Sequence, residues 1–180
     1  GHLLPDNYGR FKDHINDYIT FMKDNGVEID VVSIQNEPDI NVSYESCDWT
    51  LDEMSDFIRL FGDSIVGAKL AAPESFNFNE NYVNNMLQNP EVVNKFDIVA
   101  GHIYGNGQRP FPIAVEKGKE IWMTEYLLNL NVGSTGANWS GLSEVSKWEE
   151  SLEMLNTVHN AMSNNWNAYI WWYLQRFYSF

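Results

Sequence analysis

The sequence contains little cysteine and no long apolar run. Cys47 is the only cysteine among 180 residues. An intrachain disulfide and a metal cluster built from several thiolates are therefore both excluded. No stretch approaches the roughly 18 consecutive apolar residues that a membrane-spanning helix requires. We expect a core held by packing alone and no membrane partner.

Basic residues are scarce as well. The chain has 11 lysines and arginines against 25 acidic residues, which gives a formal net charge of −14. Such a field repels phosphate backbones, so nucleic acid is not an expected partner. The sequence has no G-x-G-x-x-G or G-K-[ST] motif for a nucleotide, and no histidine and carboxylate group has convincing metal-ligand spacing. We therefore predict no cofactor and no metal.

Apolar and aromatic residues are abundant, at 44% and 14% of the chain, so one sizeable core is possible. Apolar segments that are typical of strands alternate with amphipathic segments that are typical of helices. The strands are expected at 31–35, 69–74, 97–104 and 120–125, with a further β-rich element at 168–174. This alternation predicts an α/β fold with a parallel sheet and crossover helices.

The strand ends favour a barrel over an open sheet. Successive strands finish in Asn-Glu, Pro-Glu, His-x-Tyr, Thr-Glu and Trp-Tyr, which would form a ring of polar and aromatic groups. A complete (β/α)8 barrel needs about 250 residues. We therefore expect residues 1–180 to be one catalytic domain, the later part of a TIM barrel with strands 4–8 and their helices. The first strands would lie outside this sequence.

Two of the strand-end glutamates, Glu37 and Glu125, form a candidate catalytic pair. Val31–Ile34 runs into Asn36-Glu37-Pro38, where Pro38 cannot continue a ladder, and a second apolar run ends at Glu125. The carboxyl edge of a parallel barrel is where active sites form. One carboxylate that protonates a departing oxygen and one that attacks the anomeric carbon make a glycosidase pair. A separation of about 5–5.5 Å would predict retention of configuration. Either acid could instead be an ordinary loop residue.

Other polar and aromatic residues lie near these ends. Asn36 could hydrogen-bond a sugar 2-hydroxyl, and His102 and Tyr104 could orient the nucleophile. Trp49 lies in a loop, where it would serve either as a sugar platform or in local packing; Trp139 has the same two interpretations.

Six strings of the chain carry a family resemblance, from about residue 2 to residue 178. They are Ser-Ile-Gln-Asn-Glu-Pro-Asp, Tyr-Glu-Ser-Cys-Asp-Trp, Ala-Pro-Glu-Ser-Phe, Gly-His-Ile-Tyr-Gly, Trp-Met-Thr-Glu and Trp-Trp-Tyr. In this order they resemble glycoside hydrolase family 30, on its bacterial xylanase branch. The resemblance implies a retaining endo-β-1,4-xylanase that acts on xylan or glucuronoxylan, with Glu37 as acid/base and Glu125 as nucleophile.

The resemblance also implies a substrate site. Asn36, Tyr104 and Trp172 would line the subsite of the cleaved sugar, and Pro73-Glu74 would have a supporting role. Arg176 and Tyr178 fall where the branch binds a glucuronate group, and an arginine pairs well with a carboxylate. Leu127 and the stretch after it depart from the pattern of the glucuronate specialists, so we expect weak dependence on glucuronate.

Two alternatives remain open at this stage. The chain could act on another β-glycan or on a glycosphingolipid, as other branches of the family do, or it could be a non-catalytic sugar-binding barrel. We expect a polysaccharide as the partner. We also expect a secreted monomer, attached to the β-sandwich domain of the family or to a carbohydrate-binding module.

Overall fold

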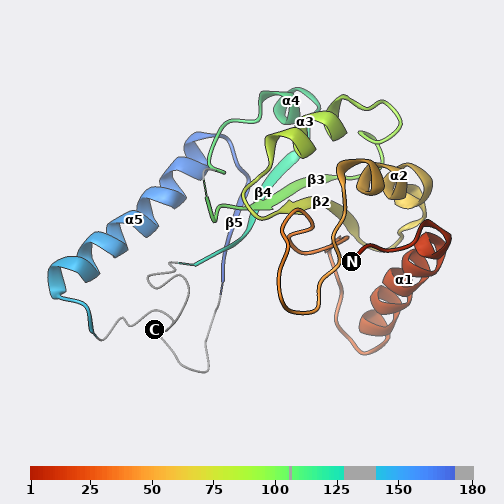
Figure 1. Ribbon diagram of the computed structural model, residues 1–180, viewed down its shortest axis with the longest axis horizontal. Helices are drawn as coiled ribbons and strands as arrows, with labels where there is room; N and C mark the ends of the chain where they lie inside the picture. Colours follow the sequence, from red (N-terminus) through yellow and green to blue (C-terminus); the bar gives the residue numbers. More distant parts are fainter. Residues whose placement is uncertain (106, 128–140, 173–180) are drawn as a thin grey trace.

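The computed structural model describes residues 1–105, 107–127 and 141–172. Its described part contains one sheet of five parallel strands, arranged side by side in chain order (Figure 1). The strands are β1 (Val31–Ser33), β2 (Lys69–Ser75), β3 (Ile98–His102), β4 (Glu120–Tyr126) and β5 (Ala168–Trp171). The helices are α1 (Tyr8–Asp24), α2 (Leu51–Phe61), α3 (Glu80–Gln88), α4 (Pro112–Glu116) and α5 (Glu144–Ser163), with 3-10 turns at Pro5–Asn7 and Gly62–Ser64.

The predicted α/β fold is confirmed, and the five strands fit strands 4–8 of a (β/α)8 barrel. A crossover helix joins each strand to the next, from α2 between β1 and β2 to α5 between β4 and β5. All pairings are parallel and follow the order of the chain, which is the topology of successive barrel units. The carboxyl ends of all five strands therefore meet at one edge.

The two faces of the sheet bury different side chains. On β4, Ile121 and Met123 join the large core beneath the helices, whereas Trp122 packs with Ala71, Ile98 and Ala100 on the other face. Successive side chains of a strand point to opposite faces, so an apolar run covers both. Because apolar side chains pack on both faces of the sheet, the sequences of these strands are nearly continuous hydrophobic stretches.

An aromatic cluster joins the first two helices to the segment before α2. Trp49 stacks on Tyr8 with ring centroids 5.4 Å apart and meets the edge of Phe57 at 5.5 Å. Its side chain is 2% exposed. A ring covered in this way cannot stack on a sugar, so the predicted platform role of Trp49 is wrong and the packing alternative is correct. Trp139 lies outside the described residues.

The helix termini test the local signals in the sequence. The Thr50 and Glu53 capping box is present, with reciprocal hydrogen bonds, and Gly26 ends α1 with a positive φ of 82°. Asp6 lies in the 3-10 turn that precedes α1. Ser143 caps α5 by accepting a hydrogen bond from the Ser146 amide.

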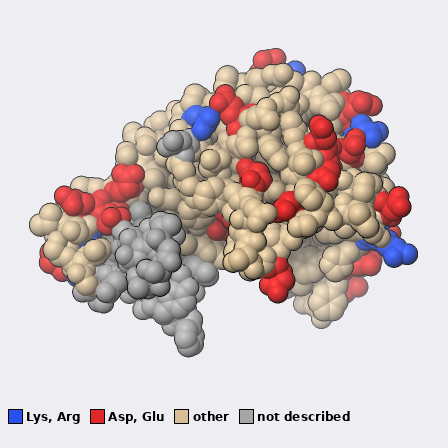
Figure 2. All heavy atoms as spheres, viewed as in Figure 1, with Lys and Arg blue, Asp and Glu red and all other residues tan. Residues whose placement is uncertain are grey.

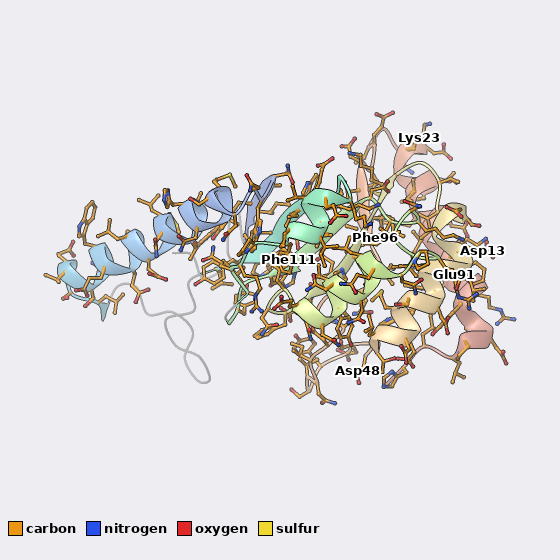
Figure 3. The ribbon with its side chains drawn as sticks, turned by 90° about the horizontal axis from the view of Figure 1, so that it is seen from above. Asp13, Lys23, Asp48, Glu91, Phe96 and Phe111 are labelled. Carbon is orange, nitrogen blue, oxygen red and sulfur yellow. The ribbon has the colours of Figure 1, made fainter. Side chains whose placement is uncertain are left out.

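Helix α5 differs most from expectation. The apolar spacing of its sequence predicts an inward-facing stripe of Trp148, Leu152, Leu155, Val158 and Met162, but all of these except the half-buried Val158 are exposed. The helix buries Thr157 and Ala161 instead. Figure 1 shows α5 running outward from the sheet, so most of its length has no described core beneath it. Seen from above in Figure 3, Phe96 and Phe111 instead lie among the packed elements near the sheet.

Acidic groups are spread over the surface, as the sequence suggested. Figure 2 shows red side chains distributed across one face, with few blue ones among them. No described helix combines the length and the apolar composition needed to cross a membrane.

Irregular pairing concentrates at the carboxyl edge. The register shifts between Pro73 and Ser75, between Gly101 and His102, and between Met123 and Tyr126. Bulges of this kind bend a strand and redirect its side chains, and they are common beside active sites. These irregularities thus affect the direction of the Glu74, His102 and Glu125 side chains at the carboxyl ends of three neighbouring strands.

Candidate active site

Glu37 lies just beyond β1, where a hydrogen bond fixes its backbone. Its amide donates to the carbonyl oxygen of Glu74 at 2.9 Å, which ties the turn after β1 to the end of β2. Its φ is 45° and that of Glu74 is 61°, a left-handed conformation that is uncommon for residues other than glycine. Such strain persists only where surrounding structure enforces it, and it occurs often at functional sites. The residue is 8% exposed.

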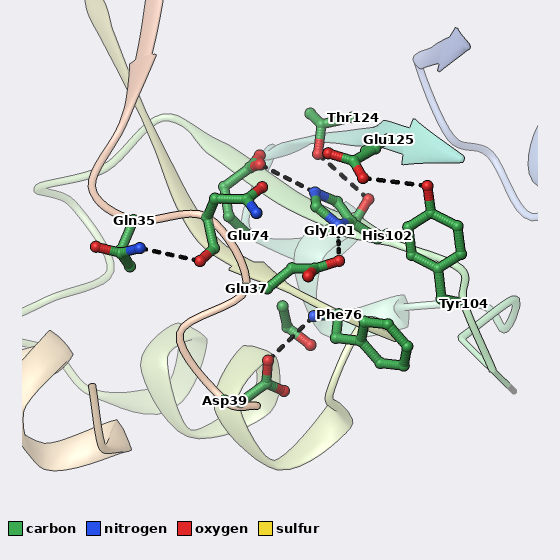
Figure 4. Close-up of polar contacts among 12 residues, drawn as sticks. Gln35, Glu37, Asp39, Glu74, Phe76, Gly101, His102, Tyr104, Thr124 and Glu125 are labelled. Atoms are coloured by element: carbon green, nitrogen blue, oxygen red, sulfur yellow. Dashed lines mark hydrogen bonds and ion pairs between the residues drawn. The ribbon is translucent and has the colours of Figure 1, made fainter. Parts of the chain in front are cut away.

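His102 connects two carboxylates at the end of β3. Its Nδ1 lies 2.8 Å from Oε1 of Glu37, and its Nε2 lies 3.3 Å from Oε2 of Glu74 (Figure 4). The histidine is 1% exposed, so water does not compete for these contacts. We expected His102 to orient the nucleophile; its hydrogen bonds go instead to the predicted acid/base and to Glu74.

Glu125 lies near the end of β4, opposite Glu37. The hydroxyl of Tyr104 donates to Oε1 of Glu125 at 3.1 Å. One carboxylate oxygen of Glu37, one of Glu125 and a ring nitrogen of His102 lie within 4.8 Å of one another. The strand ends therefore bring together the two glutamates that the sequence paired, and Tyr104 contacts Glu125 as expected.

The contacts of His102 determine its charge. Burial acts to lower its pKa, but the hydrogen bonds to Glu37 and Glu74 and the nearby Glu125 charge outweigh it and raise the pKa to about 9. The imidazole is therefore protonated at neutral pH, and both of its N–H groups donate to carboxylates.

Glu125 and Tyr104 are affected by the same enclosed environment. Burial raises the pKa of Glu125, while the His102 charge and the Tyr104 hydroxyl oppose this shift. Burial and the Glu125 carboxylate raise the pKa of Tyr104 well above its usual range, so its hydroxyl stays a donor. The net effect is a raised pKa for Glu125, and the Tyr104 donor and the His102 charge limit this rise.

A metal ion could in principle be coordinated by the group of Glu37, His102 and Glu125. Their carboxylate oxygens and imidazole nitrogen are common metal ligands, and they lie close enough together for one ion to contact all three. A metal requires a free lone pair on the imidazole. Here both ring nitrogens of His102 face carboxylates, and the ring is protonated at neutral pH. The geometry fits an ion-paired histidine better than a ligand, and the absence of a metal stays a prediction.

The remaining predicted site residues have different outcomes. Asn36 is exposed beside Glu37, and Trp172 follows β5 with 42% of its side chain exposed and its amide donating to Tyr126. Both lie at the carboxyl edge, and their contact with a sugar stays a prediction. Arg176 and Tyr178 lie outside the described residues.

The sequence assigned Glu74 a supporting role but did not identify the residues that it contacts. The signal was present, because Pro73-Glu74 ends a strand as Asn36-Glu37 does. The structure gives Glu74 direct contacts to both His102 and the Glu37 backbone. Phe76 was not assigned a role either; its ring stacks on Tyr104 with centroids 5.4 Å apart and covers one side of that tyrosine.

The charge of His102 predicts a pH dependence of stability. Its pKa of about 9 in the folded state lies above the 6.5 of an unperturbed histidine. Its contacts therefore stabilise the fold fully below pH 6.5, and this contribution is lost as the pH rises toward 9. We expect the difference in unfolding free energy between the wild-type protein and a His102→Gln variant to narrow over that interval in urea titrations. A constant difference would mean that His102 is not charged.

The fold and the site together define a class of protein. A set of consecutive parallel β/α units with two facing carboxylates at its carboxyl edge is the architecture of a barrel glycoside hydrolase. Comparisons with known proteins give a closer relationship, although no family model matches the chain.

The chain is 37% identical to glucuronoxylanase XynC of Bacillus subtilis over 182 aligned residues, which cover 98% of this chain. A crystal structure of the family 30 subfamily 8 xylanase Xyn30A from Clostridium acetobutylicum matches 97% of the chain with a TM-score of 0.83 and 32% identity. A family 30 endoxylanase from Clostridium papyrosolvens C71 matches with a TM-score of 0.80 and 31% identity. Over nearly its whole length, the chain is thus similar in sequence and in fold to bacterial xylanases of glycoside hydrolase family 30.

The match covers only part of each relative. The chain spans 40% of the length of XynC and 42% of each of the two Clostridium chains. The described strands therefore correspond to part of their barrels.

Proposed function

We propose that the protein with this sequence is a retaining endo-β-1,4-xylanase, with Glu37 as acid/base and Glu125 as nucleophile. The separation of the two carboxylates is the observation that carries the proposal. An oxygen of one carboxylate lies within 4.8 Å of an oxygen of the other, and this short separation supports the retaining arrangement, in which the two carboxyl groups lie about 5–5.5 Å apart. The relatives named as xylanases support the choice of substrate.

In the first step, Glu125 attacks the anomeric carbon as the glycosidic carbon–oxygen bond breaks. Glu37 gives its proton to the departing oxygen, so an alcohol leaves and a glycosyl ester of Glu125 forms. The Tyr104 hydroxyl orients Glu125 for this attack, and together with the His102 charge it favours the ionised form of Glu125 against the effect of burial. His102 is the last residue of β3 and Tyr104 follows it closely, so both groups are anchored by one strand and help to keep the nucleophile in position.

In the second step, Glu37 has become a carboxylate and accepts a proton from water. The water oxygen attacks the anomeric carbon, the ester bond breaks, and Glu125 regains its charge. Glu37 must therefore gain and lose one proton in every cycle, next to His102. Two displacements at the same carbon restore the original β configuration.

The substrate class follows from the relatives and the acidic surface. A neutral β-linked chain meets no electrostatic barrier at a protein with a net charge of −14, while a polymer of dense negative charge would. We propose linear xylan and glucuronoxylan as substrates. We also propose that the protein is secreted, because such polymers do not enter cells.

The test is hydrolysis by the full-length gene product that contains this sequence. We expect cleavage of glucuronoxylan and, more slowly, of undecorated xylo-oligosaccharides, with the β anomer appearing first in proton NMR spectra of the products. A β-1,6-glucan and a glucosylceramide serve as comparison substrates. Faster cleavage of either would replace the xylan assignment, an initial α anomer would exclude the retaining mechanism, and no cleavage at all would favour a binding role.

A further inference from the structure

Glu74 is a buried carboxylate for which the double displacement gives no task. It is 7% exposed, lies at the end of β2, and does not belong to the pair that contacts the sugar. A carboxylate withdrawn from water is costly unless charged or polar partners compensate it. The partner of Glu74 is His102, whose Nε2 lies 3.3 Å from Oε2 of the glutamate.

Glu74 reaches the predicted acid/base by two routes. Its carbonyl oxygen accepts the Glu37 amide at 2.9 Å, and its side chain contacts the histidine that contacts Glu37 at 2.8 Å. The backbone of Glu74 adopts a left-handed φ of 61°, which turns the residue so that both routes operate together. Figure 4 shows His102 between Glu37 and Glu74.

We propose that Glu74 is a positioning residue for the acid/base: acting through His102, it keeps the imidazole ring oriented with one N–H group donating to Glu37. This inference rests on the proposed function. It assigns to Glu74 a share in the proton transfer although Glu74 does not touch the sugar.

The orientation of His102 decides which oxygen of Glu37 carries the proton. Oε1 of Glu37 accepts from Nδ1–H of His102, so an acidic proton on Glu37 must sit on Oε2. A neutral histidine has only one N–H group and could turn its lone pair toward Glu37, which would place the proton between the two residues. That proton would then be unavailable to the departing oxygen.

Glu74 disfavours the neutral form of His102, because its carboxylate requires an N–H donor at Nε2 in addition to the one at Nδ1. With a carboxylate on each ring nitrogen, only the doubly protonated ring satisfies both partners. The charged groups that face His102 are Glu37 after β1, Glu74 on β2 and Glu125 on β4, with the neutral hydroxyl of Tyr104 beside Glu125. During the cycle Glu37 and Glu125 each lose their charge once, so Glu74 is the anion that remains constant.

The test is a Glu74→Gln variant of the full-length gene product, assayed with aryl β-xylobiosides of different leaving groups. A phenyl leaving group requires a proton from Glu37, whereas a 2,4-dinitrophenyl group departs without one. General acid catalysis contributes about 10²–10⁴-fold, so partial loss of it should lower kcat/KM for the phenyl substrate about tenfold to a hundredfold. We expect less than about a threefold change for the dinitrophenyl substrate. Glu116→Gln, an exposed glutamate on α4, is the matched control.

A purely structural role predicts a different pattern. Misfolding or loss of packing would lower the rate on both substrates by the same factor, and this result would overturn the proposal. So would an unchanged rate on the phenyl substrate.

A second measurement does not depend on activity. Nitrogen-15 NMR titration can follow the charge of the His102 ring, with its signals assigned by comparison with His102→Gln. In the wild-type protein the ring should stay charged through neutral pH. In Glu74→Gln it should lose its proton at a lower pH than in the wild-type protein. Identical titrations would overturn the proposal. If the wild-type protein cleaves no glycoside while the His102 titration shifts as expected, the proposed function fails and the ion pair stands.

Discussion

Replacing Glu125 by glutamine should abolish turnover. The amide is a poor nucleophile and cannot form the glycosyl ester, while its size leaves the Tyr104 hydrogen bond and the strand intact. Loss of a nucleophile that acts in a concerted group typically costs about 10⁴-fold or more in kcat. We expect this decrease for Glu125→Gln on glucuronoxylan, measured as reducing ends released per minute, with substrate binding retained.

The same strand offers a matched control. Glu120 lies at the opposite end of β4, where it pairs with Lys69 at the surface at 2.8 Å. Exposed pairs of this kind contribute little to stability, so Glu120→Gln should keep nearly full activity. If Glu125→Gln retained more than about a hundredth of the wild-type rate, Glu125 would not be the nucleophile.

The second large effect is expected at Glu37. Glu37→Ala removes the proton donor of the first step and the base of the second, so hydrolysis of xylan should fall about 10²–10⁴-fold. A 2,4-dinitrophenyl xylobioside needs no acid for departure, so its first step should persist and the glycosyl-enzyme should accumulate. Azide ions can enter the space left by the buried Glu37 side chain and need no base. We therefore expect azide to restore turnover on this substrate.

The azide product assigns the two roles. Azide that attacks a glycosyl-enzyme in Glu37→Ala gives a β-glycosyl azide, because two displacements occur at the anomeric carbon. In Glu125→Ala, azide takes the place of the nucleophile and a single displacement gives an α-glycosyl azide. Proton NMR distinguishes the anomers. The opposite pairing of variant and anomer would reverse the assignment of acid/base and nucleophile.

The sequence alone predicted the sheet and the two glutamates. Apolar runs such as Val31–Ile34 and Ile121–Met123 indicate strands without knowledge of any partner, and the proline after Glu37 limits where the first one ends. Carboxyl ends of parallel strands share one edge, so two glutamates at such ends are brought near each other by topology alone. The Thr50-x-x-Glu53 pattern is likewise a short-range signal, and it predicts the capping box that begins α2.

Only the tertiary structure decided the contacts that depend on distant segments. Trp49 reads as an exposed loop residue until Tyr8 and Phe57 cover it, and the α5 stripe reads as buried although the described part of the fold leaves it open. The hydrogen bonds of His102 depend on the direction of side chains at strand ends where the register shifts, and no local sequence pattern predicts these shifts. Side-chain partners depend on register and on the direction of strand ends, and these are set by the packing of the whole sheet. The residue types at the edge were thus readable from the sequence, whereas the link from Glu74 through His102 to Glu37 required the fold.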